Sequence, residues 1–484
     1  MALEDIRNER LKKLALLKER GISAYPATSE RTTTIKDLLS RFDEAVDTEK
    51  VTVAGRVLSI REHGGSIFFN ISDGTGTIQG YVKQDELPAD VFSLFVDVVD
   101  IGDFIDLMGV PMRTKRGEPT VLASGWRMLT KSIRTLPEKW AGLTDPEERL
   151  RKRYLDILSH SELKEMFEKR ALFWDRTRTF LKDKGFLEVE TPTLEITTGG
   201  AEARPFITHH NDFDINLYLR ISVGELWQKR LLAAGFPRTF EVGRVYRNEG
   251  TSAEHVQEFT NFEFYAAYMD YEGGIAFTEE LIRDVATSVF GTSAFSTRGF
   301  TFDLKDTWER LDYVSTVEKM TGVNVLNDSE EVLKQKLQEL HVEHTGENRE
   351  RLTDTLWKFC RKQITGPAWL MNHPKLVSPL SKVHPDNPLL TQRVQLLLAG
   401  SEMTNGFAEL NDPVDQKERF LLQQKLIDAG DTEAMMPDWE FVEMLEHGMP
   451  PAFGFAYGDR LFAFLVDKPI RETQLFPLMR PKKE

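Results

Sequence analysis

Cysteine is almost absent from this sequence, since Cys360 is the only one in 484 residues. A single thiol excludes an internal disulfide. This fits a reducing compartment, so we expect a cytoplasmic protein. We interpret Cys360 as a thiol of the core, without a catalytic role.

Long apolar runs and a secretion signal are also missing. No stretch approaches the roughly 18 consecutive apolar residues of a membrane helix, so we expect no membrane attachment. The segment Met1 to Arg20 is charged throughout and has no apolar core of the signal-peptide kind. The sequence shows no motif for a Ser–His–Asp triad, and we expect none.

Positive charge is in the minority. The chain has 62 Lys and Arg against 77 Asp and Glu, a net charge of -15. This balance argues against a protein that coats nucleic acid non-specifically. It leaves room for a local basic face that binds a particular RNA.

The first segment, Leu3 to Arg20, has apolar residues at near-helical spacing, and Gly21 is the expected stop. Its other side carries mostly basic residues. Two interpretations stay open, a helix that faces RNA and an ordinary solvated surface helix. We assign residues 1–45 to a helical N-terminal extension.

A strand-rich segment follows. Five runs of strand character and one helical stretch near 85–95 lie along it, the strands at 51–57, 66–72, 77–82, 104–110 and 120–123. This order is typical of a five-stranded barrel of the oligonucleotide-binding (OB) type, which we place at 46–135. A small barrel without a nucleic-acid role is the alternative. The charged segment 136–155 is interpreted as a linker, and 156–484 as one large α+β domain.

The most informative stretch of the second domain is a hairpin pattern, Phe240–Gly250 followed by Glu258–Tyr265. Four residues of the second run share one face by alternation, namely Phe259, Asn261, Glu263 and Tyr265. With Arg247 on the facing strand, they form a polar floor that is costly to bury without a ligand. The alternative is a surface hairpin with paired charges.

This hairpin resembles motif 2 of the class II aminoacyl-tRNA synthetases. Gly185–Pro192 resembles their motif 1, and Gly458–Arg460 with the apolar run after it resembles motif 3. Ser401–Asp412 is similar to the lysine-specific members, and the resemblance extends through the barrel and Leu136–Trp140.

The resemblance implies an anticodon-binding barrel and an antiparallel catalytic sheet flanked by helices. The implied activity is ligation of L-lysine to tRNA(Lys) with ATP and Mg²⁺, in a homodimer formed through motif 1. Lysine would first form an adenylate and then pass to the tRNA, with no covalent enzyme intermediate.

The resemblance also implies roles in ATP binding. Arg247 would bridge the amino-acid carboxylate and the α-phosphate, because its charged fork suits two oxyanions. Arg460 and Phe259 would hold the two faces of adenine, with Arg460 also at the γ-phosphate. Glu249 and His255 would hold the purine edge and the bent triphosphate, although a loop histidine without a role is the alternative for His255.

A second set of residues corresponds to the lysine pocket. Glu409 and Tyr265 would receive the ε-ammonium, because a buried cation needs a fixed anion. Glu225 and the backbone of Gly200 would bind the α-ammonium. The remaining contacts are expected from Glu263, Asn405 and Phe407. Relatives specific for aspartate or asparagine have an arginine-bearing signature at 407–409, which argues against those substrates.

On the barrel, the residues that correspond to anticodon contacts are Arg61, Phe68, Gln79 and Glu118. An exposed aromatic ring and base-edge donors are what unstacked bases require. Phe68 and Phe69 are neighbours on one strand, so one can point inward and the other outward. Only the resemblance selects Phe68, and core packing is its alternative.

Two departures from the family pattern stand out. The Mg²⁺-binding acids would fall at 395 and 402, but Gln395 is neutral and only Glu402 is acidic, which predicts a weaker, shifted or differently occupied metal site. Motif 3 has bulky Phe455 and Tyr457, which we expect to remodel the floor of the ATP site.

Two further alternatives remain. The first is a non-catalytic protein that holds lysine or tRNA without activating it. The departures support it, and the presence of the other motif residues opposes it, namely Arg247, Glu249, Phe259, Glu402 and Arg460. A relative that attaches a lysine analogue to an elongation factor is opposed by the barrel.

Overall fold

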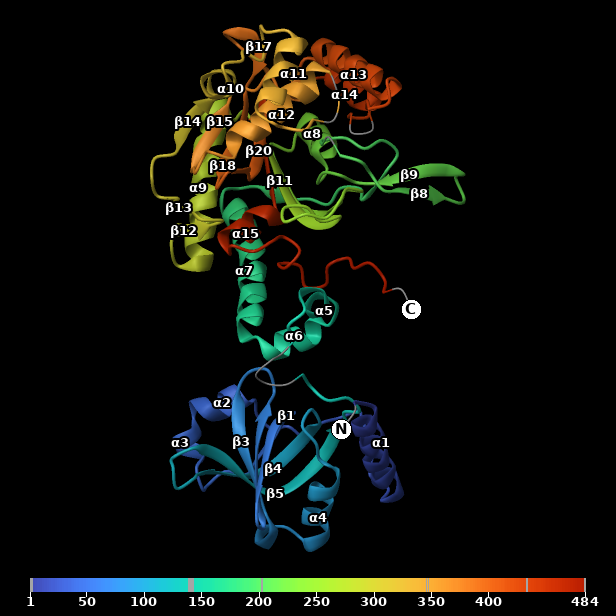
Figure 1. The fold of residues 1–484 in the computed structure, drawn as a ribbon, viewed down its shortest axis with the longest axis vertical. Helices are drawn as coiled ribbons and strands as arrows, with labels where there is room; N and C mark the ends of the chain where they lie inside the picture. Colours follow the sequence, from blue (N-terminus) through green and yellow to red (C-terminus); the bar gives the residue numbers. More distant parts are fainter. Residues whose placement is uncertain are drawn as a thin grey trace. The chain divides into compact units, whose positions relative to one another are not determined.

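The computed structural model describes residues 3–137, 143–201, 203–344, 346, 348–431 and 434–482. The chain divides into two compact units, Met1–Thr144 and Asp145–Glu484 (Figure 1). Residues 138–142, which belong to the expected linker and to the Leu136–Trp140 match, lie outside the described residues. Within the described parts, no helix is both long enough and apolar enough to cross a membrane.

The first unit is a closed five-stranded barrel with strand order β1-β2-β3-β5-β4. Its elements are α1 (Leu3–Glu19), α2 (Ile35–Ser40), α3 (Phe42–Ala45), β1 (Val51–His63), β2 (Ser66–Ser72), β3 (Thr77–Lys83), the 3-10 helix η1 (Gln84–Glu86), α4 (Ala89–Val98), β4 (Phe104–Arg113) and β5 (Pro119–Thr130).

The barrel follows from alternation of burial along Val51–Val57 of β1 and along β2 and β3. Phe69 on β2 is fully buried and packs against Phe95, whereas Phe68 is half-buried and stacks on Tyr81 outside the barrel. The expected N-terminal helix is confirmed as α1, which ends just before Gly21 at φ 70°.

The second unit is built from mixed helices and strands. Its N-terminal half contains α5 (Pro146–Arg151), α6 (Arg153–Ser159), α7 (Ser161–Asp183), β6 (Leu187–Glu188), β7 (Leu194–Glu195), β8 (Ile207–His210), β9 (Ile215–Leu219), α8 (Glu225–Ala233), β10 (Arg238–Tyr246), β11 (Glu258–Ala267), α9 (Tyr271–Phe290), β12 (Ala294–Thr297) and β13 (Phe300–Asp303). Its C-terminal half contains β14 (Glu309–Asp312), α10 (Tyr313–Thr321), α11 (Glu330–Glu339), α12 (Arg349–Arg361), β15 (Ala368–Met371), η2 (Lys375–Val377), β16 (Val383–His384), β17 (Asn387–Thr391), β18 (Arg393–Leu398), β19 (Ser401–Glu402), β20 (Thr404–Ala408), α13 (Pro413–Asp428), α14 (Trp439–His447), β21 (Ala452–Gly458) and α15 (Asp459–Leu465).

The central sheet of this unit has the order β14-β15-β18-β20-β21-β11-β10-β6, with β19 paired to β18. Its interior pairs from β15 to β10 are antiparallel, as expected. Both edges differ from the expectation, because β6 pairs with β10 and β14 pairs with β15 in parallel. The sheet is therefore mixed, and the α+β class is confirmed.

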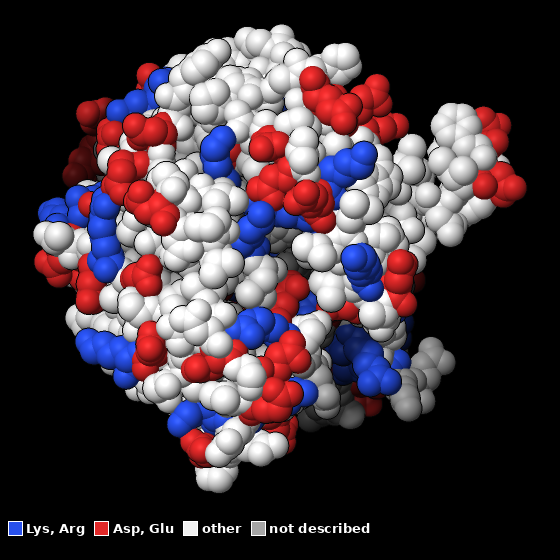
Figure 2. All heavy atoms as spheres, turned by 90° about the horizontal axis from the view of Figure 1, so that it is seen from above, with Lys and Arg blue, Asp and Glu red and all other residues white. Residues whose placement is uncertain are grey.

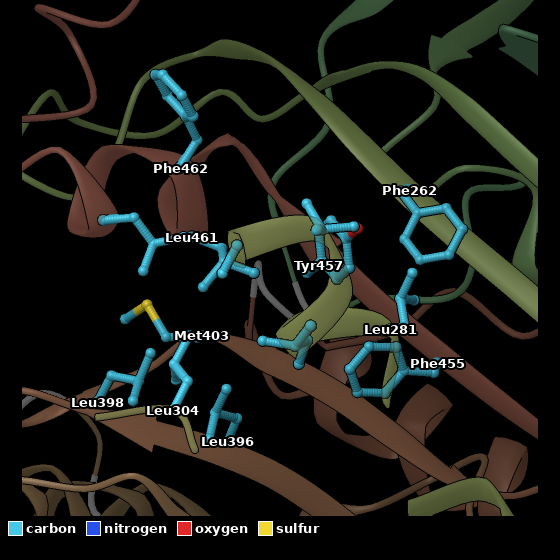
Figure 3. Packing of buried hydrophobic residues seen from close by; sticks show 14 of the residues in the cluster. Phe262, Leu281, Leu304, Leu396, Leu398, Met403, Phe455, Tyr457, Leu461 and Phe462 are labelled. Carbon is cyan, nitrogen blue, oxygen red and sulfur yellow. The ribbon is translucent and has the colours of Figure 1, made fainter. Parts of the chain in front are cut away.

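Helices cover the two faces of this sheet. The main core fills the space between the sheet and the long helices α7 and α9. Figure 3 shows part of it, where Phe455 and Tyr457 of β21 pack with Phe262 of β11. The opposite face is covered by α8, α13 and α14, which form a smaller cluster around Phe407 and Phe441.

Candidate active site

A cavity of about 580 Å³ opens on the helix-poor part of this second face. Its floor is made by β11, β20 and β21, and α12 contributes one wall. Acidic and basic side chains are mixed over the face of the molecule shown in Figure 2. The cavity lies between the sheet and α12, and many of the side chains that line it are charged. Such a lining suits a charged ligand.

The hairpin of β10 and β11 places the first group of site residues. Val245 is opposite Phe259 and Glu241 is opposite Glu263 in an unbroken antiparallel register. All four residues that alternate along β11 line the cavity, as the period of two predicts: Phe259, Asn261, Glu263 and Tyr265.

Arg247 lies one residue beyond the end of β10, rather than on the strand as expected, and also lines the cavity. Its Nε and Nη2 atoms each donate to the carbonyl of Ile221 at 3.2 Å, and its guanidinium lies 5.4 Å from the ring centre of Phe259. Desolvation lowers the pKa of Arg247, but the guanidinium remains charged at neutral pH.

Glu263 is the centre of a buried hydrogen-bond network. Its Oε1 accepts from the backbone of Val223 at 2.7 Å and from Asn261 at 3.1 Å, and its Oε2 accepts from the hydroxyl of Tyr265 at 2.8 Å. Burial raises the pKa of Glu263, and the nearby carboxylate of Glu225 raises it further. The network fixes the carboxylate in the inner part of the cavity.

Motif 3 supplies Arg460 at the start of α15. Its Nη1 donates to the carbonyl of Glu402, and its Nη2 lies 3.2 Å from Nε2 of His255. His255 is held on its other side by the hydroxyl of Ser252, at 2.8 Å from Nδ1. Arg460, His255, Glu249 and Glu402 all line the same cavity as Arg247.

The bulky residues of motif 3, Phe455 and Tyr457, border this cavity, but their side chains do not fill its floor as expected. Phe455 and Tyr457 point into the core, where the hydroxyl of Tyr457 is 2.7 Å from Thr177. Gly454, Ala456 and Gly458 alternate with them on the other face. A Cβ on Gly454 would lie 2.1 Å from Oε1 of Glu409, so only glycine fits there.

The expected α-ammonium binders, Gly200 and Glu225, meet at the N-terminus of α8. Gly200 has φ 84°, and a Cβ on it would lie 2.8 Å from Oε2 of Glu225. Gly224, which precedes α8, has φ 66°, and a Cβ there would lie 2.1 Å from the hydroxyl oxygen of Thr191. Two glycines thus allow the motif 1 segment and the 200 loop to close on this helix.

Glu409 is fully buried and does not itself line the cavity, in contrast to the expectation of an open ammonium receptor. Its Oε1 lies over Gly454, which does line it. Among the described residues, neither carboxylate oxygen accepts a hydrogen bond of good geometry. Lys229 forms an ion pair with Oε2 at 2.5 Å. Burial raises the pKa of Glu409.

Asn405 and Phe407 belong to β20 and both line the cavity. Arg393 donates from Nε to Oδ1 of Asn405 at 2.9 Å, so a guanidinium holds the side-chain amide of Asn405 in place. Phe407 is buried, and its ring centre lies 5.2 Å from Nζ of Lys229.

The expected metal positions, Gln395 and Glu402, are neighbours. Gln395 Nε2 donates to Glu402 at 3.4 Å, and Trp357 donates to its other oxygen at 2.5 Å. Gln395 Oε1 is 2.8 Å from Nε2 of His373, whose pKa burial lowers to about 3. The other ring nitrogen of His373, Nδ1, is 3.2 Å from a second oxygen, the backbone carbonyl of Arg393. A neutral ring has only one N–H, so it can donate to one of these oxygens and not both.

These donors fit one Mg²⁺. One carboxylate plus substrate phosphates is a common way for a protein to hold this ion, and an amide oxygen is a further suitable donor. Within the described residues, no group of three or more His, Cys, Asp or Glu could hold a metal. The fit therefore depends on the phosphates of a nucleotide.

The barrel residues form a separate surface. Cross-strand pairing puts Arg61 beside Phe68, and Phe68 beside Tyr81, with the two rings stacked at 4.3 Å. Gln79 pairs with Thr120, whose hydroxyl donates to its side-chain oxygen at 3.0 Å, and the exposed Glu118 is two residues before Thr120. The structure thus places Phe68 in an aromatic pair with Tyr81 and Gln79 in a polar pair with Thr120.

Three residues of the site are not identified by the sequence patterns. Lys229, Arg393 and His373 contact Glu409, Asn405 and Gln395, respectively. The spacing of four between Glu225 and Lys229 is the one available signal, because it places both on one face of a helix.

Comparisons with known proteins agree with this geometry. Residues 145–480 match the family model "tRNA synthetases class II (D, K and N)", and residues 51–129 match the "OB-fold nucleic acid binding domain". A lysine–tRNA ligase of Thermotoga maritima is 43% identical, covering 99% of this chain and 97% of the relative. That of Carboxydothermus hydrogenoformans is 44% identical, covering 99% of both chains.

A lysine–tRNA ligase of Roseiflexus castenholzii is 41% identical over the whole of both chains. The matches thus extend across the barrel, the hairpin and motif 3 in one continuous alignment. The chain belongs to the class II tRNA synthetases, and within them to the family of the lysine–tRNA ligases.

Proposed function

We infer that this protein is a lysine–tRNA ligase. It activates L-lysine with ATP to give lysyl-adenylate and pyrophosphate, and then transfers lysine to the 3′ end of tRNA(Lys). The observation that carries this is the juxtaposition of two arginines, Arg247 and Arg460, with a buried cluster of carboxylates at one cavity.

The arginine half of the cavity suits ATP. Arg460 and Phe259 offer flat surfaces for the adenine, while Glu249 and His255 border the space for the purine edge and the phosphates. Arg247 would bridge the α-phosphate and the lysine carboxylate. Its fixed charge would stabilise the negative charge that builds up at phosphorus as the carboxylate attacks.

The carboxylate half suits the two ammonium groups of lysine. Glu225 with the Gly200 backbone would receive the α-ammonium, and Glu409 with Tyr265 the ε-ammonium. Glu263 would add negative charge between them, Phe407 would pack on the alkyl chain, and Asn405 would hold the carboxylate. An aspartate side chain would meet like charges here, which disfavours that substrate.

Mg²⁺ would be held by Glu402 and the substrate phosphates, and when bound would neutralise phosphate charge. Gln395, at the second expected position, directs its Nε2 at Glu402 and its oxygen at His373. The residues themselves orient the phosphates and the carboxylate for in-line displacement. None of them needs to act as a covalent nucleophile.

The direct test is aminoacylation of a tRNA(Lys) transcript by the purified chain. We expect lysine to be charged, and aspartate and asparagine not to be. Because the substrates are tRNA and ATP, we place the protein in the cytoplasm. Charging of aspartate in place of lysine would refute the proposed function.

The barrel would bind the anticodon through Phe68, Gln79, Arg61 and Glu118. Replacing Phe68 by alanine should raise the KM for tRNA about tenfold, since one base-stacking contact is worth about 1–3 kcal/mol. Aminoacylation measured against tRNA concentration checks this. Pyrophosphate exchange without tRNA is the internal control and should be unchanged. An unaltered tRNA KM would refute the role of Phe68.

The homodimer is proposed to form through the motif 1 region. One apolar side chain within Gly185–Pro192 and two just after it are exposed in the single chain, with Leu187 at 49%, Leu194 at 49% and Ile196 at 72%. Light scattering at micromolar concentration should give twice the 55.5 kDa of one chain. Ile196→Asp should shift the mass toward the monomer, whereas Leu389→Asp, at an exposed apolar residue elsewhere, should not. A monomeric wild type would refute this assembly.

A further inference from the structure

Lys229 is a buried ammonium that no expectation from the sequence included. It lies on α8 one turn after Glu225, whose Oε1 accepts from its Nζ at 2.7 Å. The same Nζ atom is 2.5 Å from Oε2 of Glu409, on the loop after β20. Its side chain is 1% exposed. One internal cation thus joins the two carboxylates proposed to receive the two ammonium groups of the substrate.

Aromatic rings enclose the same ammonium. Its Nζ lies 5.2 Å from the ring centre of Phe407, 5.7 Å from that of Tyr265 and 5.9 Å from that of Phe441 on α14. These rings exclude water and attract a cation. Glu225 and Glu409 are the charged groups that pair with Lys229, and Glu263 lies near them and is faced by Arg247. Arg230, which pairs with Asp438, contacts the same Phe441 ring as Lys229.

The net charge of the side chains at this end of the cavity is opposite to the net charge of lysine, when all of the groups are counted as ionised. Three carboxylates and the two cations Lys229 and Arg247 leave one negative charge. Lysine, with two ammonium groups and one carboxylate, carries one positive charge. Without Lys229 the empty pocket would hold two uncompensated negative charges in a place of low dielectric, where a carboxyl group takes up a proton.

We propose that Lys229 is a positioning and specificity-determining residue, which stabilises the ionised form of Glu409 in the empty pocket and so makes the ε-ammonium subsite selective for a cation. This inference rests on the proposed function, because it assumes that the pocket binds lysine.

The titration of the cluster supports this role. Burial alone would lower the pKa of Lys229, but the carboxylates of Glu225 and Glu409 raise it, so it stays charged. Burial raises the pKa of Glu409, and Lys229 counteracts that rise. Glu409 attracts an ammonium only when ionised. Affinity for lysine therefore rises with pH until Glu409 is ionised, and removal of Lys229 moves that rise to higher pH.

The test is the pH dependence of lysine binding, measured by calorimetry on the full chain. For Lys229→Met we expect the Kd for lysine to rise about 30-fold at about pH 6.5 and less than about threefold at about pH 8.5, relative to wild type. Norleucine, which lacks the ε-ammonium, should compete better with lysine in this variant at the lower pH. If Lys229 had only a structural role, the substitution would weaken lysine binding equally at both pH values and would not improve competition by norleucine at the lower pH.

A double variant guards against a folding defect. Lys229→Met with Glu263→Gln removes one charge of each sign and restores the net charge of the cluster. Since Glu263 is itself a pocket residue, the double variant is compared with Glu263→Gln alone. Glu263 also raises the pKa of Glu409, so we expect Lys229→Met to cause a smaller further loss at about pH 6.5 in that background than in wild type.

Lys131→Met is the matched control. Lys131 is equally buried between two carboxylates, Asp100 at 2.5 Å and Asp103 at 2.7 Å, but lies in the barrel unit. It should leave lysine binding at wild-type values. Wild-type protein that does not bind lysine would refute the proposed function itself. Wild-type binding with no pH-dependent loss in Lys229→Met, or with an equal loss from Lys229→Met in wild type and in the Glu263→Gln background, would overturn only the role of Lys229.

Discussion

Replacement of Glu409 by glutamine is expected to raise the KM for lysine about 100-fold, which corresponds to about 3 kcal/mol. The amide has the same shape as the carboxyl group but offers no charge to an ammonium, and its NH₂ group repels one. Among the described residues, Lys229 forms an ion pair with Oε2 of the carboxylate, and Oε1 accepts no hydrogen bond. A substrate ammonium would therefore satisfy it directly. Pyrophosphate exchange at varied lysine concentration measures the effect.

The KM for ATP reports on the other half of the cavity and should stay within about twofold, because no phosphate contact is altered. Glu418→Gln, a change of the same kind at an exposed position of α13, is the matched control. An unchanged lysine KM in Glu409→Gln would refute the ε-ammonium assignment and leave the fold and the ATP site standing.

Replacement of Arg247 by lysine is expected to lower kcat for exchange about 100- to 1,000-fold, the usual effect of losing one donor to a developing oxyanion. The planar fork can contact the phosphate and the carboxylate together, whereas an ammonium acts as a single point charge. Because the interaction strengthens in the transition state, kcat should fall more than the KM for ATP rises. Steady-state exchange at saturating lysine separates the two constants.

Arg244→Lys is the matched control for this change. Arg244 lies three residues earlier on β10, pairs with Glu258 at 2.8 Å and does not line the cavity. Its substitution should leave kcat within about twofold, because a partly exposed ion pair contributes little. A loss in Arg244→Lys as large as that in Arg247→Lys would show that the hairpin as a whole, and not the oxyanion contact, was damaged.

Local patterns explain what could be predicted from the sequence. Alternation along β11 is a property of neighbouring residues, so the order of residues alone is sufficient to place Phe259, Asn261, Glu263 and Tyr265 on one face. The same rule requires Phe68 and Phe69 to point in opposite directions. It does not say which of them fills the barrel, because a strand pattern does not specify its inner face without knowledge of the other strands.

What could not be predicted depends on distant contacts. The parallel pairing of β6 with β10 joins segments about fifty residues apart, and no local pattern reports it. The role of Lys229 is of the same kind. A lysine on a helix is usually solvated, and this one is buried only because β11, β20 and α14 pack around it on α8. Motif 3 differs from the prediction for a simpler reason. Phe455 and Tyr457 point into the core, and the small residues Gly454, Ala456 and Gly458 alternate with them on the face of the cavity.

The measurement that tests the account most directly is ATP–pyrophosphate exchange with each of the standard amino acids, with Mg²⁺ and after its removal by a chelator. The account predicts exchange with lysine alone, dependent on Mg²⁺, which would show that Gln395 is compatible with activation. No exchange with any amino acid, in folded protein that binds ATP, would contradict it and favour a protein that only holds its ligands. Exchange with another amino acid would refute the roles given to Glu409 and Lys229.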